Sequence, residues 1–379
     1  MQTHTCFLYE NKWQNLDNAA LAAADYQLVL VFADRFLLED KGHIATIKQT
    51  FPGATIVSCS TSGEISGRQV HDNSLVATAI HFDNTALQFA NANAANFTNS
   101  RQLGENVASQ LPAEDLKYVL VISNGGKVNG SELVSAINET LGENVIVTGG
   151  LAGDGARFEK TLVGLNEDIN EGAVVLVGFY GEHLKIGYGL NGGWEVFGPE
   201  RVITKSDQNV LYEIDHQNAL QLYKKYLGKY ASELPGSALL FPLAIKTGND
   251  ETTVVRTILT IDEDKQTMTF AGNVPEGAAV RLMKANFDQL IYSAGEAATL
   301  ANGLMNETAP QLVLLISCVG RKLVLGRRIE EEVEAAADIF PASPAVTGFY
   351  SYGEISPLKQ TGSCELHNQT MTITTLAEI

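Results

Sequence analysis

The feature that most constrains the fold is a strand–helix–strand unit that the chain repeats three times. In each copy an apolar strand and a helix lead into a second strand, which ends in an acidic turn beside glycine. The spacing from mid-strand to acidic residue is 34, 34 and 40 residues: Leu30 to Glu64, Leu120 to Asp154 and Leu314 to Glu354. Units of this length favour parallel strand pairs joined by helical crossovers.

The strands and their surroundings predict an α/β fold with mixed (α+β) character. The strands are continuous Val/Ile/Leu runs, which is typical of strands covered on both faces. Hairpin patterns lie between the units, at residues 75–82 with 86–90 and at 253–261 with 266–271. We therefore predict two related halves whose mixed β-sheets are covered by helices, facing each other across a pseudo-two-fold axis.

A glycine- and proline-rich segment suggests where the two halves meet. Residues 192–199 read Gly-Gly-Trp-Glu-Val-Phe-Gly-Pro, and we place the boundary near residues 200–210, giving domains 1–205 and 206–379. The sequence predicts a helix start on either side of this segment. Ser131 is a candidate N-cap for a helix that ends at Gly142, and Asp215 for one that ends at Gly228.

Composition excludes several classes of partner. The 379 residues carry a formal net charge of −18, which disfavours nucleic acid or anionic lipid, because like charges repel at long range. No apolar run is long enough to span a membrane, and no secretory signal pattern opens the sequence. The four cysteines are far apart and lack a C-x-x-C pair, which argues for reduced thiols. We expect a soluble cytoplasmic protein.

The acidic turns are the first candidates for a ligand site, because α/β proteins build sites at strand ends. Glu64 and Glu354 could meet a ligand, or could hold their own loops through hydrogen bonds to local backbone. Because the acidic turn occurs in more than one copy, the loop-holding role is favoured for both glutamates. Arg157, in the glycine-rich run 149–157, could bind a carboxylate with two hydrogen bonds, although a tight structural turn explains these glycines better. Trp194 offers a large aromatic face in a permissive loop.

Nucleophile and metal patterns are weak. Cys59 lies at a strand end without a histidine near it in sequence, and no His-x-x-x-His pair indicates a metal centre. One further repeat involves histidine. The segments 71–74 (His-Asp-Asn-Ser) and 367–370 (His-Asn-Gln-Thr) each follow an acidic turn and lead directly into a strand.

Several of these segments, in this order, resemble the FIST (F-box and intracellular signal transduction) sensory family, with its N-terminal and C-terminal domains. The matching stretches are Cys59 to Ile65, Gly149 to Phe158, Gly193 to Pro199, Val210 to Asp215, Gly348 to Ile355 and Leu366 to Thr372. The resemblance implies a small-ligand sensor of bacterial signal transduction that is not an enzyme. It suggests a ligand site formed by five residues: Glu64, Arg157, Trp194, Tyr352 and Glu354.

A FIST protein of this size is also similar to stand-alone haemoproteins that sense nitric oxide and regulate a partner histidine kinase. That similarity implies haem b, with His367 as the first candidate ligand and His183 and His71 next. A structural role for His367, bonding its strand to a neighbour, is an equal alternative. A second copy of the chain, as a homodimer, is a further candidate partner.

Three other hypotheses stay open at this stage. A haem-free FIST sensor would bind an amino acid or similar metabolite, with Arg157 or Arg201 as the carboxylate partner. An enzyme would use Cys59 or Glu64 as nucleophile or base. A protein-interaction scaffold would bind its partner without any dependence on ligand.

Overall fold

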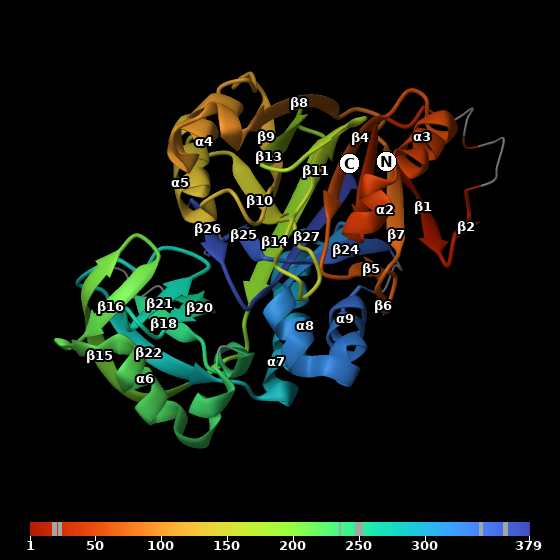
Figure 1. Ribbon diagram of the computed structural model, residues 1–379. Coiled ribbons are helices and arrows are strands. Elements are labelled where there is room, and N and C mark those ends of the chain that lie inside the picture. Colours follow the sequence, from red (N-terminus) through yellow and green to blue (C-terminus); the bar gives the residue numbers. More distant parts are fainter. Residues whose placement is uncertain (17–20, 22–24, 235, 247–252, 341–343, 359–362) are drawn as a thin grey trace.

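The computed structural model describes residues 1–16, 21, 25–234, 236–246, 253–340, 344–358 and 363–379. Three related units account for most of the chain, and a fourth sheet is inserted into the third unit (Figure 1). The α/β class with mixed sheets and helical covers is confirmed.

Unit 1 contains the first parallel strand pair. Its elements are β1 (Gln2–Tyr9), β2 (Lys12–Gln14), β3 (Leu28–Ala33), α2 (Arg35–Glu39), α3 (Lys41–Thr50), β4 (Thr55–Ser60), β5 (Glu64–Ser66), β6 (Gln69–His71) and β7 (Leu75–His81). Strands β3 and β4 pair in parallel, and β7 and β1 continue the sheet antiparallel.

Unit 2 repeats this order with two helices of its own. Its elements are β8 (Ala86–Asn93), η1 (Ala94–Asn96), α4 (Ser100–Ala108), β9 (Leu116–Ser123), α5 (Gly130–Leu141), β10 (Ile146–Leu151), β11 (Val163–Leu165), β12 (Asp168–Asn170) and β13 (Ala173–Tyr180). Asn129, not Ser131, caps α5: its side chain accepts from the amides of residues 131 and 132. The predicted cap was two residues late, because Asn at the preceding turn makes the same bond.

Unit 3 is split between residues 184–191 and 287–379. Its elements are β14 (Leu184–Asn191), α7 (Phe287–Gly303), β23 (Leu312–Cys318), α8 (Val319–Leu325), η4 (Gly326–Arg328), α9 (Ile329–Ala337), β24 (Ala345–Ser351), β25 (Gly353–Pro357), β26 (Cys364–His367) and β27 (Met371–Glu378). Strand order is the same in all three sheets: β4-β3-β7-β1, β10-β9-β13-β8 and β24-β23-β27-β14.

The strand after each acidic turn leaves its own sheet and joins that of another unit. Strand β5 of unit 1 pairs with β24 of unit 3, β25 of unit 3 with β10 of unit 2, and β11 of unit 2 with β4 of unit 1. This exchange is cyclic, whereas a two-fold arrangement requires a reciprocal one. The predicted pseudo-two-fold was therefore wrong: the units follow a pseudo-three-fold order, and one apolar core draws side chains from all three sheets.

The inserted domain, residues 195–284, lies between β14 and α7 and stands apart from the three sheets at the lower left of Figure 1. Its elements are β15 (Glu195–Asp207), β16 (Val210–Ile214), β17 (Gln217–Asn218), α6 (Ala219–Leu227), η2 (Gly228–Glu233), η3 (Gly236–Leu240), β18 (Leu243–Lys246), β19 (Thr253–Arg256), β20 (Ile258–Asp262), β21 (Thr267–Phe270) and β22 (Ala279–Lys284). It has an apolar core of its own. The boundary that we predict at residue 205 falls inside β15.

Two predicted hairpins had opposite outcomes. Strands β20 and β21 form the expected antiparallel pair around residues 263–266. Strands β7 and β8 do not pair: β7 stays in the sheet of unit 1 and β8 joins β13 in unit 2. The carboxylate of Glu378 explains the separation, because it accepts from the backbone amides of residues 83, 84 and 85 and so holds this turn against β27.

Asp215 does not cap a helix. It lies in the left-handed region (φ 49°) between β16 and β17, where its carboxylate binds Arg201. Asn218 caps α6 instead, through a bond to the amide of residue 221.

Candidate functional site

The cyclic strand exchange brings the turns of all three units to one place. Three equivalent backbone hydrogen bonds close the ring, each from the turn after the second parallel strand of one unit to the end of the corresponding strand of another unit. They are Ser62 N to Tyr350 O (2.8 Å), Gly153 N to Ser60 O (2.9 Å) and Tyr352 N to Leu151 O (3.1 Å). Each turn is therefore fixed by a neighbouring unit as well as by its own.

Glu64 holds the turn of unit 1. It is fully buried; one carboxyl oxygen accepts from the Thr61 hydroxyl, and the other accepts from the Ser74 hydroxyl at 2.6 Å and from the Ser74 amide at 3.3 Å. Burial raises the pKa of Glu64 to about 8, against the lowering effect of these hydrogen bonds. The carboxyl group connects two segments of its own unit and faces no solvent.

Glu354 repeats this arrangement in unit 3. Its carboxyl group accepts from the Ser351 hydroxyl at 2.7 Å, and from the hydroxyl and amide of Thr370 at 2.8 and 3.1 Å. Burial raises its pKa to about 7. Both glutamates thus make the contacts that the loop-anchor interpretation requires.

The turn of unit 2 differs, because its acid binds arginine. Asp154 is fully buried and accepts from Nε of Arg157 at 2.7 Å, while Nη2 of Arg157 donates to Asp34 at 2.8 Å. Burial alone would lower the pKa of Arg157, but the bonds to Asp34 and Asp154 raise it above its usual range. Arg157 is therefore committed to two carboxylates of the chain, and the structural-turn interpretation fits it better than a two-bond grip on a ligand.

An exposed aromatic surface lies over this ion-pair group. The ring of Phe158 stacks on Tyr352 with centroids 4.7 Å apart, and the guanidinium of Arg157 lies 5.0 Å from the ring centre of Phe36. Phe36 and Phe158 are 53% and 51% exposed. We call Phe36, Arg157, Phe158 and Tyr352 the three-turn surface.

Phe158 has an unusual backbone conformation. Its φ is 54°, in the left-handed region that bulky side chains rarely adopt. Its amide donates to the Tyr352 hydroxyl at 3.2 Å, and that hydroxyl also donates to Gly155 O at 3.3 Å. One hydroxyl from another unit therefore binds both the strained residue and Gly155 of the same turn.

Two family models together match most of the chain. The FIST N domain model matches residues 27–217, and the FIST C domain model matches residues 219–357. The chain belongs to the FIST family. FIST domains are sensor domains of signal transduction, so membership supports a sensory role for this chain.

Comparisons with two individual proteins say less about this chain than the family models do. Uncharacterized protein MJ1623 of Methanocaldococcus jannaschii is 22% identical over 320 residues, which cover 76% of this FIST protein and 59% of that relative. The chain thus spans about three fifths of the relative's length. A cyanuric acid hydrolase from A. caulinodans aligns over 100% of this chain and 98% of its own, with 8% identity and a TM-score of 0.41, too low to carry an argument.

The predicted site residues of this FIST protein fall into two groups. Arg157 and Tyr352 meet at the three-turn surface. Trp194 lies elsewhere, buried beside the inserted domain, where its Nε1 donates to Gln369 O at 2.7 Å. Glu354 accepts from Thr370 of the same hairpin, so Trp194 and Glu354 both bind one segment, whereas the carboxyl group of Glu64 binds within unit 1.

The three candidate haem ligands do not fit that role. His367 is buried, its Nε2 bonds Ser356 O at 2.9 Å, and burial lowers its pKa to about 4, so it connects β26 to β25. His183 lies in an exposed turn and bonds Ile379 O. His71 packs on Phe7 beside a cavity of about 380 Å³. That cavity is lined by acidic Glu10 and Asp72 as well as by apolar side chains, and His71 is not among the residues that line it.

The chemistry for an enzyme or a metal site is also weakly supported. All four cysteines are buried, and burial raises the pKa of Cys59 well above its usual range, which keeps the thiol protonated. Within the described residues, no three His, Cys, Asp or Glu side chains are grouped to hold a metal ion. Likewise, none of the described helices is long and apolar enough to cross a membrane.

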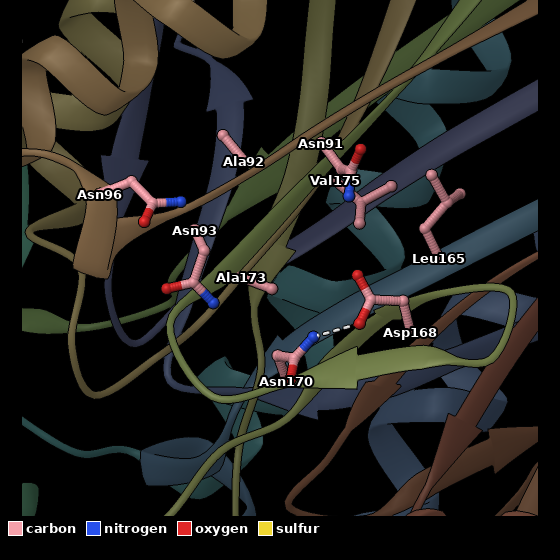
Figure 2. Close-up of a pocket in the computed structure, with 9 residues that line it drawn as sticks. All are labelled: Asn91, Ala92, Asn93, Asn96, Leu165, Asp168, Asn170, Ala173 and Val175. Atoms are coloured by element: carbon pink, nitrogen blue, oxygen red, sulfur yellow. Dashed lines mark hydrogen bonds between the residues drawn. The ribbon is translucent and has the colours of Figure 1, made fainter.

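A second cavity lies away from these turns. It has a volume of about 230 Å³ and is lined by residues of β8, β13 and the β11–β12 hairpin of unit 2, together with Asn96 (Figure 2). Its lining is rich in carboxamides: Asn91, Asn93, Asn96 and Asn170, together with Asp168. None of the predicted site residues lines it.

Sequence reasoning missed part of the three-turn surface. Asp34, Arg35 and Phe36 follow β3 directly, and Arg35 contacts Asp154 at 3.4 Å. The signal was present, because the strand-end rule applies to the first strand of each pair as well as to the second.

Proposed function

We propose that this FIST protein is a non-enzymatic small-ligand sensor that takes its ligand on the three-turn surface. The observation that carries the proposal is Phe158, a half-exposed aromatic residue held in a strained conformation by the Tyr352 hydroxyl. Strain of this kind costs roughly 1–3 kcal/mol and is concentrated at functional sites. The ring is half-exposed and stacks on Tyr352 alone among the described rings, so it gains less from packing than a core phenylalanine would.

The composition of the surface suggests a small planar ligand. Two half-exposed aromatic rings belong to it: Phe36 lies against the Arg157 guanidinium, and Phe158 stacks on Tyr352. Aromatic faces favour stacking. A planar aromatic compound, an aromatic amino acid included, matches these rings, while the guanidinium keeps its bonds to Asp34 and Asp154.

The position of the surface supports a route from ligand to partner. Tyr352 belongs to unit 3, Arg157 and Phe158 to unit 2, and Phe36 to unit 1, so a ligand here contacts all three units. A shift at one turn acts on the others through the three ring-closing backbone bonds. A histidine kinase is the partner that we propose to test, on the basis of the family's role in signalling.

A thermal-shift experiment tests this function with benzoate, nicotinate and L-phenylalanine as probes. Binding to the folded state raises the melting temperature. Phe158→Gly removes both the strain and the stacking ring, so we expect unchanged or higher stability without ligand, and loss of the probe-dependent shift. Asn306→Gly is the matched control, because Asn306 is another exposed left-handed residue (φ 45°), far along the chain in the turn after α7.

Two results would oppose the proposal: no probe raises the melting temperature, or the shift survives in Phe158→Gly. The haem and nitric-oxide version stays a prediction of the resemblance. Its test is the absorption spectrum of protein expressed with haem supplied, where a Soret band that moves on addition of nitric oxide would support it.

A further inference from the structure

The inserted domain rests on the hairpin between β26 and β27, and this contact buries polar groups that find no hydrogen-bond partner among the described residues. The hairpin is the segment 367–370, the second copy of the His-plus-three-polar pattern. All four of its residues are buried. In unit 1 the equivalent segment is more open: the side chain of Asp72 is 66% exposed, although Ser74 is fully buried. The same local pattern therefore lies partly in water in one unit and under a domain in the other.

Asn368 is the clearest of these buried groups. Its side chain is fully buried, and neither its carbonyl oxygen nor its amide nitrogen has a hydrogen-bond partner within the described part of the chain. Oε1 of the adjacent Gln369 has none either, while its amide donates to Leu239 O of the inserted domain at 3.4 Å. Buried carboxamides nearly always find partners, so an unpartnered one needs an explanation.

Arg256 supplies a buried cation at the same contact. It is 5% exposed, and its three hydrogen bonds all go to backbone carbonyls: Asn273 O at 3.0 Å, Val255 O at 3.2 Å and Leu366 O at 3.0 Å. No carboxylate of the described residues forms an ion pair with it. A buried charge without a counter-ion is rare in proteins.

These groups lie close together. Leu366, which accepts the bond from Arg256, is two residues from Asn368, a distance of about 7 Å along a strand. The positive charge of Arg256 also acts on the ring of His367, adding to the effect of burial that lowers its pKa. The cation and the two carboxamides thus belong to neighbouring parts of the contact between the inserted domain and unit 3.

We propose that this interdomain site, formed by Arg256, Asn368 and Gln369, binds a small carboxylate. Nη2 of Arg256, which takes part in none of the three bonds to backbone carbonyls, can donate a charge-assisted hydrogen bond to a carboxylate oxygen. The amide nitrogen of Asn368 can donate to the same ligand, and Oε1 of Gln369 can accept from a hydroxyl or ammonium group on it. Ligand sites occur preferentially between domains. The site is separate from the three-turn surface and does not depend on it.

The charge around the site favours a carboxylate over phosphate. The chain carries a net charge of −18, and the nearby Glu365 adds a negative charge that acts on Arg256. Both features disfavour a dianion more strongly than a monoanion.

Two connections make the contact suitable for a sensor. The inserted domain joins unit 3 through residues 192–194 and 285–286, and a small apolar cluster around Trp194 and Leu290 holds it. Gly193 in the first connection has φ 67°, a conformation that glycine adopts without strain. A ligand that neutralises Arg256 would stabilise the closed contact, and its loss would favour separation of the domain from the hairpin.

The test uses the full chain with acetate, succinate, L-glutamate and inorganic phosphate as probes, in thermal-shift and calorimetric titrations. We expect at least one carboxylate to raise the melting temperature in a saturable way. Asn368→Leu should weaken its binding about tenfold or more, and should keep or raise the melting temperature without ligand, because it removes an unpartnered carboxamide. Arg256→Met should abolish binding.

Arg201→Met is the matched control, because Arg201 is on the same domain but already paired with Asp215 at 2.7 Å and with Tyr226. It should leave carboxylate binding unchanged, as should Phe158→Gly, which separates this site from the three-turn surface. Arg256→Met could fail to fold; Asn368→Leu then decides the matter.

Three outcomes would overturn the proposal. The first is that no carboxylate raises the melting temperature. The second is that Asn368→Leu lowers the melting temperature and leaves the probe response intact, as a purely structural carboxamide held by water would require. The third is that phosphate binds as tightly as the best carboxylate.

Discussion

The buried carboxyl groups Glu64 and Glu354 predict that this protein loses stability as the pH rises above neutrality. Both lie out of contact with water, and burial raises their pKa values to about 8 and about 7. The perturbation is a change of pH in the wild type, compared with Glu64→Gln and Glu354→Gln, which remove one ionisable carboxyl group each.

The magnitude follows from the shift in pKa. Raising the pKa of Glu64 from 4.5 to about 8 makes its ionised form roughly 5 kcal/mol less stable in the folded protein than in the unfolded chain. The folded state binds the proton more tightly, so the stability is fully present below about pH 4.5 and is lost as the pH rises through 8. Each ionising group contributes a slope of about 1.4 kcal/mol per pH unit within that window.

The buried His367 narrows the pH range in which the glutamates alone determine the slope of stability against pH. Burial lowers the pKa of His367 to about 4, so the stability that depends on its neutral form is present above about pH 6.5 and is lost as the pH falls through 4. Its slope opposes that of the glutamates below about pH 6.5. Above that value we expect Glu64 alone to remove roughly 2 kcal/mol by about pH 8, with a smaller loss from Glu354.

Urea denaturation followed by far-ultraviolet circular dichroism, between about pH 6.5 and 8.5, measures this slope. Glu64→Gln should flatten most of it and Glu354→Gln the part near pH 7. Glu143→Gln, in the exposed turn after α5, should keep the full wild-type slope. A flat wild-type curve, or an unchanged slope in Glu64→Gln, would refute the reasoning. It would mean that the Thr61 and Ser74 donors keep the carboxylate ionised in spite of burial.

Three shorter predictions follow from single contacts. Hydrogen bonds from Thr85 and its neighbours outweigh burial and hold the pKa of Glu378 at about 2. Glu378→Gln should therefore lower the free energy of unfolding by roughly 2–3 kcal/mol at neutral pH, and the wild type should lose this stability between about pH 4.5 and 2. Equal urea midpoints for the two proteins at neutral pH would contradict this prediction. In Gly153→Ala the new Cβ would lie 2.4 Å from Oγ of Ser62, so we expect the free energy of unfolding measured with urea to fall by about 3 kcal/mol. The control Gly303→Ala has open space around its new Cβ and should be neutral or stabilising. A thiol reagent should modify none of the four buried cysteines in the native protein and all of them in urea; a fast-reacting native thiol would revive the nucleophile hypothesis.

The local elements were largely predictable, because they follow from patterns within a few residues. The Val/Ile/Leu runs became buried strands, and the parallel pairs β3–β4, β9–β10 and β23–β24 formed as the spacing predicts. Helix ends were less certain. Asn129 and Asn218 cap helices for which we chose Ser131 and Asp215, because several Asn, Asp and Ser side chains near a helix start can make the same bond.

The candidate site was predictable only in part. The strand-end rule found Arg157, Tyr352 and the two glutamates, and Arg157 and Tyr352 do meet. Trp194 was placed with them because it is aromatic and follows glycines, but it packs under the inserted domain. Which aromatic side chain is exposed depends on what covers it, and the sequence around Trp194 carries no sign of that.

The sequence by itself determined the three repeated units, their strands and the polar character of each turn, because hydrophobic period and turn chemistry act over short distances. The tertiary structure decided which sheet each exchanged strand joins, since backbone hydrogen bonds at a strand edge accept any strand of suitable direction. It also decided that Asp72 and Asn73 are exposed while His367–Thr370 lies buried beneath the inserted domain. Two segments of one pattern thus differ in environment, and burial changes the free energy of a polar group more than the identity of its neighbours in sequence does.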